Sequence, residues 1–114
     1  MIVKDYKFGS ITIDGVAYIK DVIIFPDHVL PNWRRREGHK LTMYDLEDVL
    51  AKKPDILVVG TGKTEMMKVP FELKQKLENK GITLQCYKTD EAVEKFNEYI
   101  DNDTDVVAAL HLTC

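Results

Sequence analysis

Three short stretches of the sequence carry groups that could bind a ligand. Residues 33–39 combine a tryptophan, three arginines and a histidine, residues 60–64 read Gly-Thr-Gly-Lys-Thr, and residues 111–114 read His-Leu-Thr-Cys. Guanidinium and imidazole groups suit carboxylates and phosphates. Glycine loops can turn N–H groups toward an anion, and histidine with cysteine suits zinc. Each stretch also has an ordinary structural interpretation.

The Gly-Thr-Gly-Lys-Thr stretch lacks the spacing of a nucleotide-binding P-loop. That motif needs a glycine five residues before its second glycine, and Leu57 occupies that position here, inside an apolar run. We therefore predict a tight turn after a strand, whose glycines allow positive φ angles. The N–H groups of Gly60, Thr61 and Gly62 are a candidate nest for a small anion.

Residues 33–39 have two interpretations. Arg35 and His39 are candidates for holding an anionic ligand, since a guanidinium and an imidazole both donate hydrogen bonds to oxyanions. Alternatively, the arginines are a solvated surface arm and Trp33 packs that arm onto the body of the protein. Both interpretations stay open at the level of the sequence.

The histidine and cysteines near the end of the sequence do not predict a metal site or a catalytic nucleophile. His111 and Cys114 are three residues apart, and such residues point to opposite faces of an extended chain. A nucleophilic Cys114 would need a base beside it, and no spacing in the sequence supplies one. Cys86 falls in a predicted strand and is interpreted as a small core residue. We predict no catalytic residue, metal or cofactor, and keep His111 as a candidate ligand contact.

The composition indicates one domain spanning residues 1–114. The hydrophobic fraction of 45% and charged fraction of 31% are ordinary for a globular protein. The net charge of −3 lacks the positive field that nucleic-acid binding needs. Neither an export signal nor a membrane-length apolar run is present, and two cysteines are too few for a disulfide framework. We expect a cytoplasmic monomer or weak homo-oligomer, with another protein or a small anion as partner, and with neither nucleic acid nor membrane.

The N-terminal part is predicted to contain a β-hairpin. The Asp-Gly pair at positions 14–15 is typical of a two-residue type I′ turn. Such a turn places Ile13 opposite Val16 and Ile11 opposite Tyr18. Extended structure is therefore expected over residues 8–25.

The following segments are a strand, an arm and a helix. Residues 22–25 are a short apolar run that the next residue, a proline, ends. Residues 26–41 show no sustained period and are predicted to be a loop-rich arm. A helix is predicted over 43–53, with Thr42 as N-cap and Asp45 at the capping-box position.

The remainder alternates strands and helices. Strands are predicted at 56–59, 83–87 and 106–110, and helices at 70–80 and 90–101. Thr89 is the predicted N-cap of the last helix. The strand at 106–110 contains no polar residue, which suits a central strand covered on both faces. The sequence thus predicts a three-layer α/β fold, with a mixed central sheet, a C-terminal βαβαβ unit and an N-terminal β-hairpin portion.

This topology predicts where a ligand site would lie. Right-handed crossovers with strand 106–110 beside strand 56–59 put the two crossover helices on opposite faces of the sheet. Open sheets bind ligands where the strand order reverses. The predicted crevice contains loop, helix-terminus, strand-end and arm residues: Gly60, Thr61, Gly62, Thr89, His111, Arg35 and His39.

Five motifs along the chain carry a family resemblance. In order they are Phe8-Gly9-Ser10, Trp33-x-Arg35-x-x-Gly38-His39, Val59-Gly60-Thr61-Gly62, Thr89-x-x-Ala92 and His111-Leu112-Thr113-Cys114. Together they resemble the adipogenesis-associated (Mth-type) domain family of small proteins of unknown function, which is related to a mitochondrial respiratory complex I assembly factor. The resemblance covers nearly the whole chain. It implies a three-layer α/β fold with a mixed central sheet, and it implies no reaction, substrate, cofactor or catalytic residue.

Two functions are compatible with these observations. The resemblance, and the lack of an acid–base, nucleophile or metal constellation, favour a non-enzymatic protein-binding or assembly module. The alternative is a small-molecule binding protein or enzyme that takes an anionic metabolite in a crevice near Gly60-Thr61-Gly62.

Overall fold

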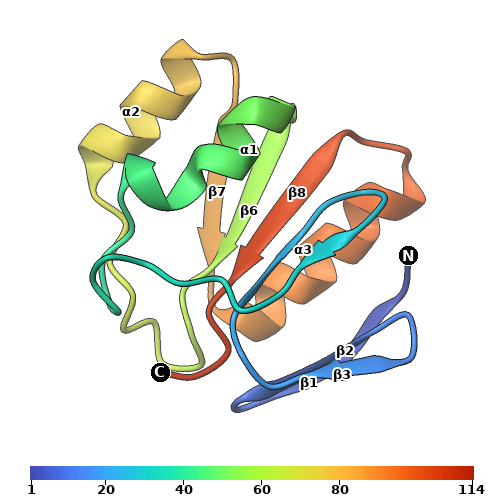
Figure 1. The fold of residues 1–114 in the computed structure, drawn as a ribbon. Coiled ribbons are helices and arrows are strands. Elements are labelled where there is room, and N and C mark those ends of the chain that lie inside the picture. Colours follow the sequence, from blue (N-terminus) through green and yellow to red (C-terminus); the bar gives the residue numbers. More distant parts are fainter.

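The computed structural model describes residues 1–114 as two β-sheets and a set of short helices (Figure 1). The elements in chain order are β1 (Val3–Lys7), β2 (Ser10–Ile13), β3 (Val16–Tyr18), β4 (Val22–Ile24), β5 (Val29–Leu30), the 3-10 helix η1 (Met43–Leu46), α1 (Glu47–Lys52), β6 (Ile56–Gly60), α2 (Phe71–Asn79), β7 (Thr83–Tyr87), α3 (Thr89–Asp101) and β8 (Val106–Leu110). The small sheet has the order β1-β2-β3 and the large sheet β5-β4-β8-β6-β7. The predicted three-layer α/β fold with a mixed central sheet is confirmed.

The large sheet has the predicted strand arrangement at its centre. β8 lies between β4 and β6, and β7 lies on the far side of β6. β6, β7 and β8 are parallel, and β4 is antiparallel to β8. All five residues of β8 are buried, as expected for a strand covered on both faces.

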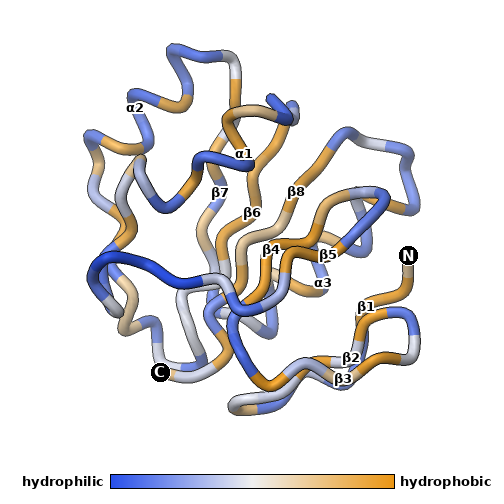
Figure 2. Tube along the Cα trace, in the orientation of Figure 1, coloured by the Kyte–Doolittle hydropathy of each residue, from blue (hydrophilic) through white to orange (hydrophobic).

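The two crossover helices pack on opposite faces of the large sheet. Leu73 and Leu77 of α2 belong to one buried cluster, and Val93 and Phe96 of α3 belong to another on the other face. The small sheet adds Ile11 and other apolar side chains to the α3 side. Figure 2 shows the apolar run of the central strands between these layers.

The predicted hairpin has the predicted register. Ile13 pairs with Val16, and Ile11 pairs with Tyr18. The turn residues at 14–15 both have positive φ angles, 49° and 80°, as a type I′ turn requires.

Strand β1, which pairs with β2, was not predicted. Its register shifts between Lys4 and Lys7, and Asp5 has a φ of 53°. These are the features of a β-bulge, which inserts an extra residue and breaks the period of two. The two-residue strand β5 within the arm is too short to leave a sequence pattern.

Two predicted helix beginnings need correction. The helix predicted over 43–53 begins as the 3-10 turn η1 and becomes α-helical only at Glu47. Asp45 does fill its predicted capping position, because its Oδ2 accepts a 2.8 Å hydrogen bond from the Thr42 N–H. Thr89 is not an N-cap, since α3 includes it and is preceded by Lys88.

Cys86 is exposed, so its assignment to the core was wrong. It lies on β7, which is an edge strand with a single neighbour. Desolvation nonetheless raises the pKa of the Cys86 thiol to about 11, although Lys74 opposes this shift. The side chain is therefore a poor nucleophile at neutral pH. None of the helices has the length and apolar composition needed to span a membrane.

Candidate functional site

Three charged or polar side chains meet at one end of the large sheet. Asp21 Oδ2 lies 2.8 Å from Arg35 Nη2 and 2.8 Å from His111 Nδ1. Arg35 Nη2 is also 3.0 Å from His111 Nδ1. The other carboxylate oxygen, Oδ1, accepts a 2.8 Å hydrogen bond from the Leu112 N–H. We call Asp21, Arg35 and His111 the ionic cluster.

Antiparallel pairing of β4 with β8 creates the Asp21–His111 contact. Val22 is paired with Leu110. Consequently the residue before β4 and the residue after β8 lie side by side.

The arm brings Arg35 to the cluster. Its guanidinium lies over the Trp33 ring, with 4.7 Å between the Cζ atom and the ring centroid. Nε and Nη2 of Arg35 donate to the Gly38 carbonyl. Trp33 is itself held by its backbone N–H, which donates to the Asp21 carbonyl at 2.8 Å, and by Nε1, which donates to the Asp45 carbonyl at 2.9 Å. Trp33 therefore packs the arm onto the body of the protein, as the second interpretation expected, whereas Arg35 points inward to Asp21 and not into solvent.

The ionic cluster is buried. Side-chain exposure is 5% for Arg35, 14% for Asp21 and 7% for His111. Burial alone raises the pKa of Asp21. Hydrogen bonds from the His111 ring, the Leu112 N–H and Arg35 outweigh it, so the pKa of Asp21 is below its usual value. Asp21 is therefore ionised at neutral pH and balances the Arg35 charge.

Two buried nitrogens of the cluster have no hydrogen-bond partner within the protein. They are Arg35 Nη1 and His111 Nε2. An ionised carboxylate only accepts, so His111 must donate to Asp21 from Nδ1, which leaves Nε2 unused. An unpaired buried polar group costs about 1–3 kcal/mol. These two atoms are thus the groups of the cluster whose hydrogen-bonding capacity is unused.

His39 lies beside His111. The two imidazole centroids are 5.7 Å apart, and the rings meet edge-on at 72°. His39 is exposed whereas His111 is buried. The structure thus brings both predicted histidines and Arg35 to one place. No group of three or more His, Cys, Asp or Glu side chains is arranged to hold a metal ion.

The Gly60-Thr61-Gly62 loop also adjoins His111, as the topology predicts. The Gly60 carbonyl accepts a 2.9 Å hydrogen bond from the His111 N–H. However, the Thr61 N–H donates to the Tyr87 carbonyl at 2.9 Å, and the Gly62 N–H donates to Thr89 Oγ1 at 2.9 Å. These two N–H groups are occupied by protein acceptors and do not form a free anion nest.

Thr89 connects the loop to the end of β8. Its fully buried hydroxyl accepts from the Gly62 N–H and donates to the His111 carbonyl at 2.6 Å. This explains why Thr89 does not cap α3. The structure gives Thr89 a positioning role behind His111.

Residues 112–114 lie against the same loop. The Lys63 N–H donates to the Thr113 carbonyl at 2.7 Å, and the Met66 N–H donates to the Cys114 carbonyl at 2.9 Å. Gly62 has a φ of 103°, and a Cβ atom there would overlap the Cys114 carbonyl group. A glycine is therefore required at this position.

Asp21 is the residue of the site that sequence analysis missed. It is an acidic residue directly before the buried strand β4. The sequence position of Asp21 indicates a role in the site only when the pairing of β4 with β8 is known, because that pairing brings Asp21 beside His111.

Comparison with known protein families identifies the family of this chain. The profile of a family described as protein of unknown function (DUF498/DUF598) matches residues 3–111. The chain belongs to this family.

Solved structures agree with the family assignment. A conserved hypothetical protein from Pyrococcus horikoshii OT3 is 29% identical, with a TM-score of 0.79 and coverage of 100% of each chain. An outer membrane protein from Bartonella henselae is 25% identical, with a TM-score of 0.84 and coverage of 98% of this chain and 94% of that one. A Mth938-like domain protein from Bordetella pertussis is 20% identical, with a TM-score of 0.74 and coverage of 96% and 84%. The last likeness shows the fold alone, and its description agrees with the Mth-type resemblance.

Proposed function

We propose that this protein is a non-enzymatic binding module whose partner is another protein that contacts the end of the large sheet. The observation that supports this proposal is a group of exposed apolar side chains at that end of the sheet. Ile19 is 74% exposed, Phe8 57% and Met66 47%. We call Phe8, Ile19 and Met66 the apolar rim.

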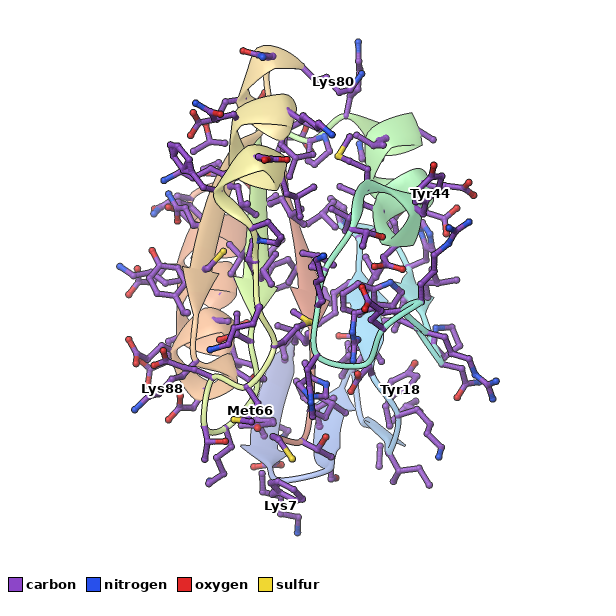
Figure 3. All side chains as sticks on the ribbon, turned by 90° about the vertical axis from the view of Figure 1, so that its left-hand side faces the viewer. Lys7, Tyr18, Tyr44, Met66, Lys80 and Lys88 are labelled. Carbon is purple, nitrogen blue, oxygen red and sulfur yellow. The ribbon has the colours of Figure 1, made fainter.

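The apolar rim comes from three separate segments that converge on residues 112–114. Phe8 is followed by Gly9, whose N–H donates to the Leu112 carbonyl at 2.8 Å, and Met66 donates to Cys114. Ile19 lines a depression of ≈430 Å³ together with Thr113. Figure 3 shows Met66 and Lys7, the neighbour of Phe8, at the same end of the molecule.

Grouped apolar side chains on a surface favour contact with another protein. Asp21 of the ionic cluster lies beside Ile19, since both line the ≈430 Å³ depression together with Trp33. This rigid support limits the conformational entropy that the rim loses on binding. The resemblance to a family related to a complex I assembly factor supports an assembly role for such contacts.

Partner capture with matched variants tests this proposal. The double variant Ile19→Ser/Met66→Ser removes two rim side chains that bury little in the free protein. Tyr44→Ser is the control, because Tyr44 is 65% exposed and lies far from Met66 and Lys7 (Figure 3). We expect proteins captured from native lysate by the wild type to be lost with the rim variant and kept with the control. Equal capture by all three proteins would contradict the proposal.

A second candidate function is the binding of a small anion at the ionic cluster. It is favoured by the unpaired Arg35 Nη1, a buried donor that suits a carboxylate oxygen. His111 Nε2 is an acceptor in the tautomer assigned above, so it can receive a hydrogen bond only from a protonated oxygen of the ligand. This arrangement supports the anionic-metabolite alternative with Arg35 as the anchor, and without the loop nest.

Thermal-shift titration with formate, acetate and phosphate tests the anion site. A site filled at about 100 times its dissociation constant stabilises the folded state by about 2.7 kcal/mol. Arg35→Lys keeps a positive charge but loses the planar donor fork, so it should abolish the shift. A flat response to all three anions argues against this second function.

A further inference from the structure

The β7 strand leaves one edge of the large sheet open. β7 pairs only with β6, whereas the opposite edge of the sheet ends in the two-residue strand β5. The Thr83 N–H and the Tyr87 carbonyl are used on the β6 side. Because backbone groups alternate in direction along a strand, the N–H and C=O groups of Leu84 and Cys86 point to the open edge.

The open edge lacks the usual devices that prevent strand pairing. Natural edge strands are commonly short, bulged, or interrupted by charges and proline. β7 has five residues, Thr-Leu-Gln-Cys-Tyr, none of them charged or proline. Thr83 and Cys86 are exposed. The Gln85 side chain in the middle of the strand is held by two hydrogen bonds, because the hydroxyls of Tyr87 and Tyr99 both donate to its Oε1.

Lysines surround this edge. Lys80 precedes β7 by a short turn and Lys88 directly follows it. Lys74 of α2 acts electrostatically on the Cys86 thiol. All three lysines are exposed, and none takes part in the ion pairs of the protein.

A depression at the C-terminal end of β7 is lined by side chains of both charges. It has a volume of ≈400 Å³, and Cys86, Lys68 and Lys88 line it together with Glu65 and Glu91. The two lysines and the two carboxylates balance in charge, but none of the four takes part in an ion pair of the protein, so Lys88 is free to pair with an acidic side chain of a partner.

We propose that the open edge of β7 binds an extended segment of a partner protein by strand addition, and that acidic residues flank the uncharged middle of that segment. The backbone groups of Leu84 and Cys86 supply the hydrogen bonds. Lys80 and Lys88 select the acidic flanks by charge complementarity. This surface is separate from the apolar rim and does not depend on the function proposed for it.

A second copy of this chain fits the edge less well. Pairing β7 with its own copy would bring Lys74, Lys80 and Lys88 of both molecules to one interface. Like charges across an interface oppose association. An acidic partner segment meets the same lysines with attraction.

Peptide titration followed by amide NMR tests the proposal. The probe is the capped peptide Glu-Asp-Thr-Val-Thr-Val-Glu-Asp, and its counterpart replaces all four acids with lysine. We expect the acidic peptide to shift the amide signals of Leu84 and Cys86 and to slow their hydrogen exchange. The lysine peptide should bind at least about tenfold more weakly.

Two variants at one position separate backbone pairing from surface contact. Cys86→Pro removes the outward N–H without removing a bond to β6, and Cys86→Ser keeps that N–H. Binding of the acidic peptide should fall at least about tenfold in the proline variant and persist in the serine variant. If Cys86→Pro does not fold, Lys80→Glu/Lys88→Glu replaces it, and this variant should prefer the lysine peptide.

Several results would overturn the proposal. The first is that millimolar acidic peptide leaves the amide signals of Leu84 and Cys86 unshifted. The second is that the acidic and lysine peptides bind equally well. The third is that Cys86→Pro binds the acidic peptide as tightly as the wild type does. Sedimentation that shows self-association of the wild type, abolished by Cys86→Pro, would assign the edge to a second copy instead.

Discussion

Asp21 and Arg35 form a buried ion pair, with 2.8 Å between Oδ2 and Nη2. This contact fixes the arm, which has only the short strand β5 as regular structure, onto the end of the large sheet. Burying two charges is costly, and a buried pair adds stability only when hydrogen bonds satisfy both partners. Asp21 meets this condition with contacts to Arg35, His111 and Leu112, whereas Arg35 keeps one unpaired nitrogen, Nη1.

Removing the carboxylate should strongly destabilise the protein. Asp21→Ala leaves Arg35 as an uncompensated buried charge, and breaking such pairs typically costs about 3–5 kcal/mol. Asp27→Ala is the matched control, because Asp27 pairs with His28 on the surface, with 84% of its side chain exposed. Urea denaturation should show a large loss for Asp21→Ala and little change for Asp27→Ala. Similar midpoints for the two variants would show that the cluster is not a stabilising element.

The stability that Asp21 contributes should depend on pH. Its pKa is lowered in the folded state, so its contribution is present above the unfolded-state pKa of about 3.9. That contribution is lost as the pH falls through the folded-state pKa. The difference in unfolding free energy between wild type and Asp21→Asn should therefore stay constant above about pH 5 and shrink below about pH 4. A difference that grows on acidification would contradict the assigned ionisation.

Gly62 should tolerate alanine much less well than Gly15. Both have positive φ, 103° and 80°, but a Cβ at Gly62 overlaps the Cys114 carbonyl while nothing lies within 4 Å of a Cβ at Gly15. Backbone strain is therefore common to both variants, and the overlap adds about 1–3 kcal/mol at Gly62. Thermal unfolding measures the difference. Equal losses would mean that residues 112–114 move aside without cost.

The Thr89 hydroxyl should matter more than its methyl group. Thr89→Val leaves the Gly62 N–H without its acceptor, and a buried unpaired group costs about 1–3 kcal/mol. Thr89→Ser keeps the hydroxyl and should retain most of the stability. Denaturation of both variants, with amide shifts of Gly62 as the local readout, checks this. The role assigned to the hydroxyl fails if serine and valine are equally destabilising.

Local patterns were sufficient for most of the fold. The strands β7 and β8 begin and end where the sequence predicts. For β8 the local signal is an apolar run bounded by turns. The hairpin register follows from its two-residue turn in the same way. β1 was missed because its bulge breaks the alternation that identifies a strand.

The candidate site was only partly predictable. Topology brought the loop at 60–62 beside His111, since parallel strands end at the same edge of a sheet. The hydroxyl of Thr89 and the carboxylate of Asp21 depend on partners more than twenty residues away. No local propensity encodes such pairs, so these roles emerge only from the three-dimensional structure.

Site-specific photo-crosslinking tests the proposed binding surface most directly. A photoreactive residue would replace Ile19 or Met66 of the apolar rim, and Tyr44 as the control position, in three otherwise identical proteins. We predict that the two rim positions crosslink to the same partner protein in cells and that position 44 does not. Crosslinking to no protein from either rim position, or to the same proteins from all three positions, would contradict the assignment of the sheet end as a protein-binding surface.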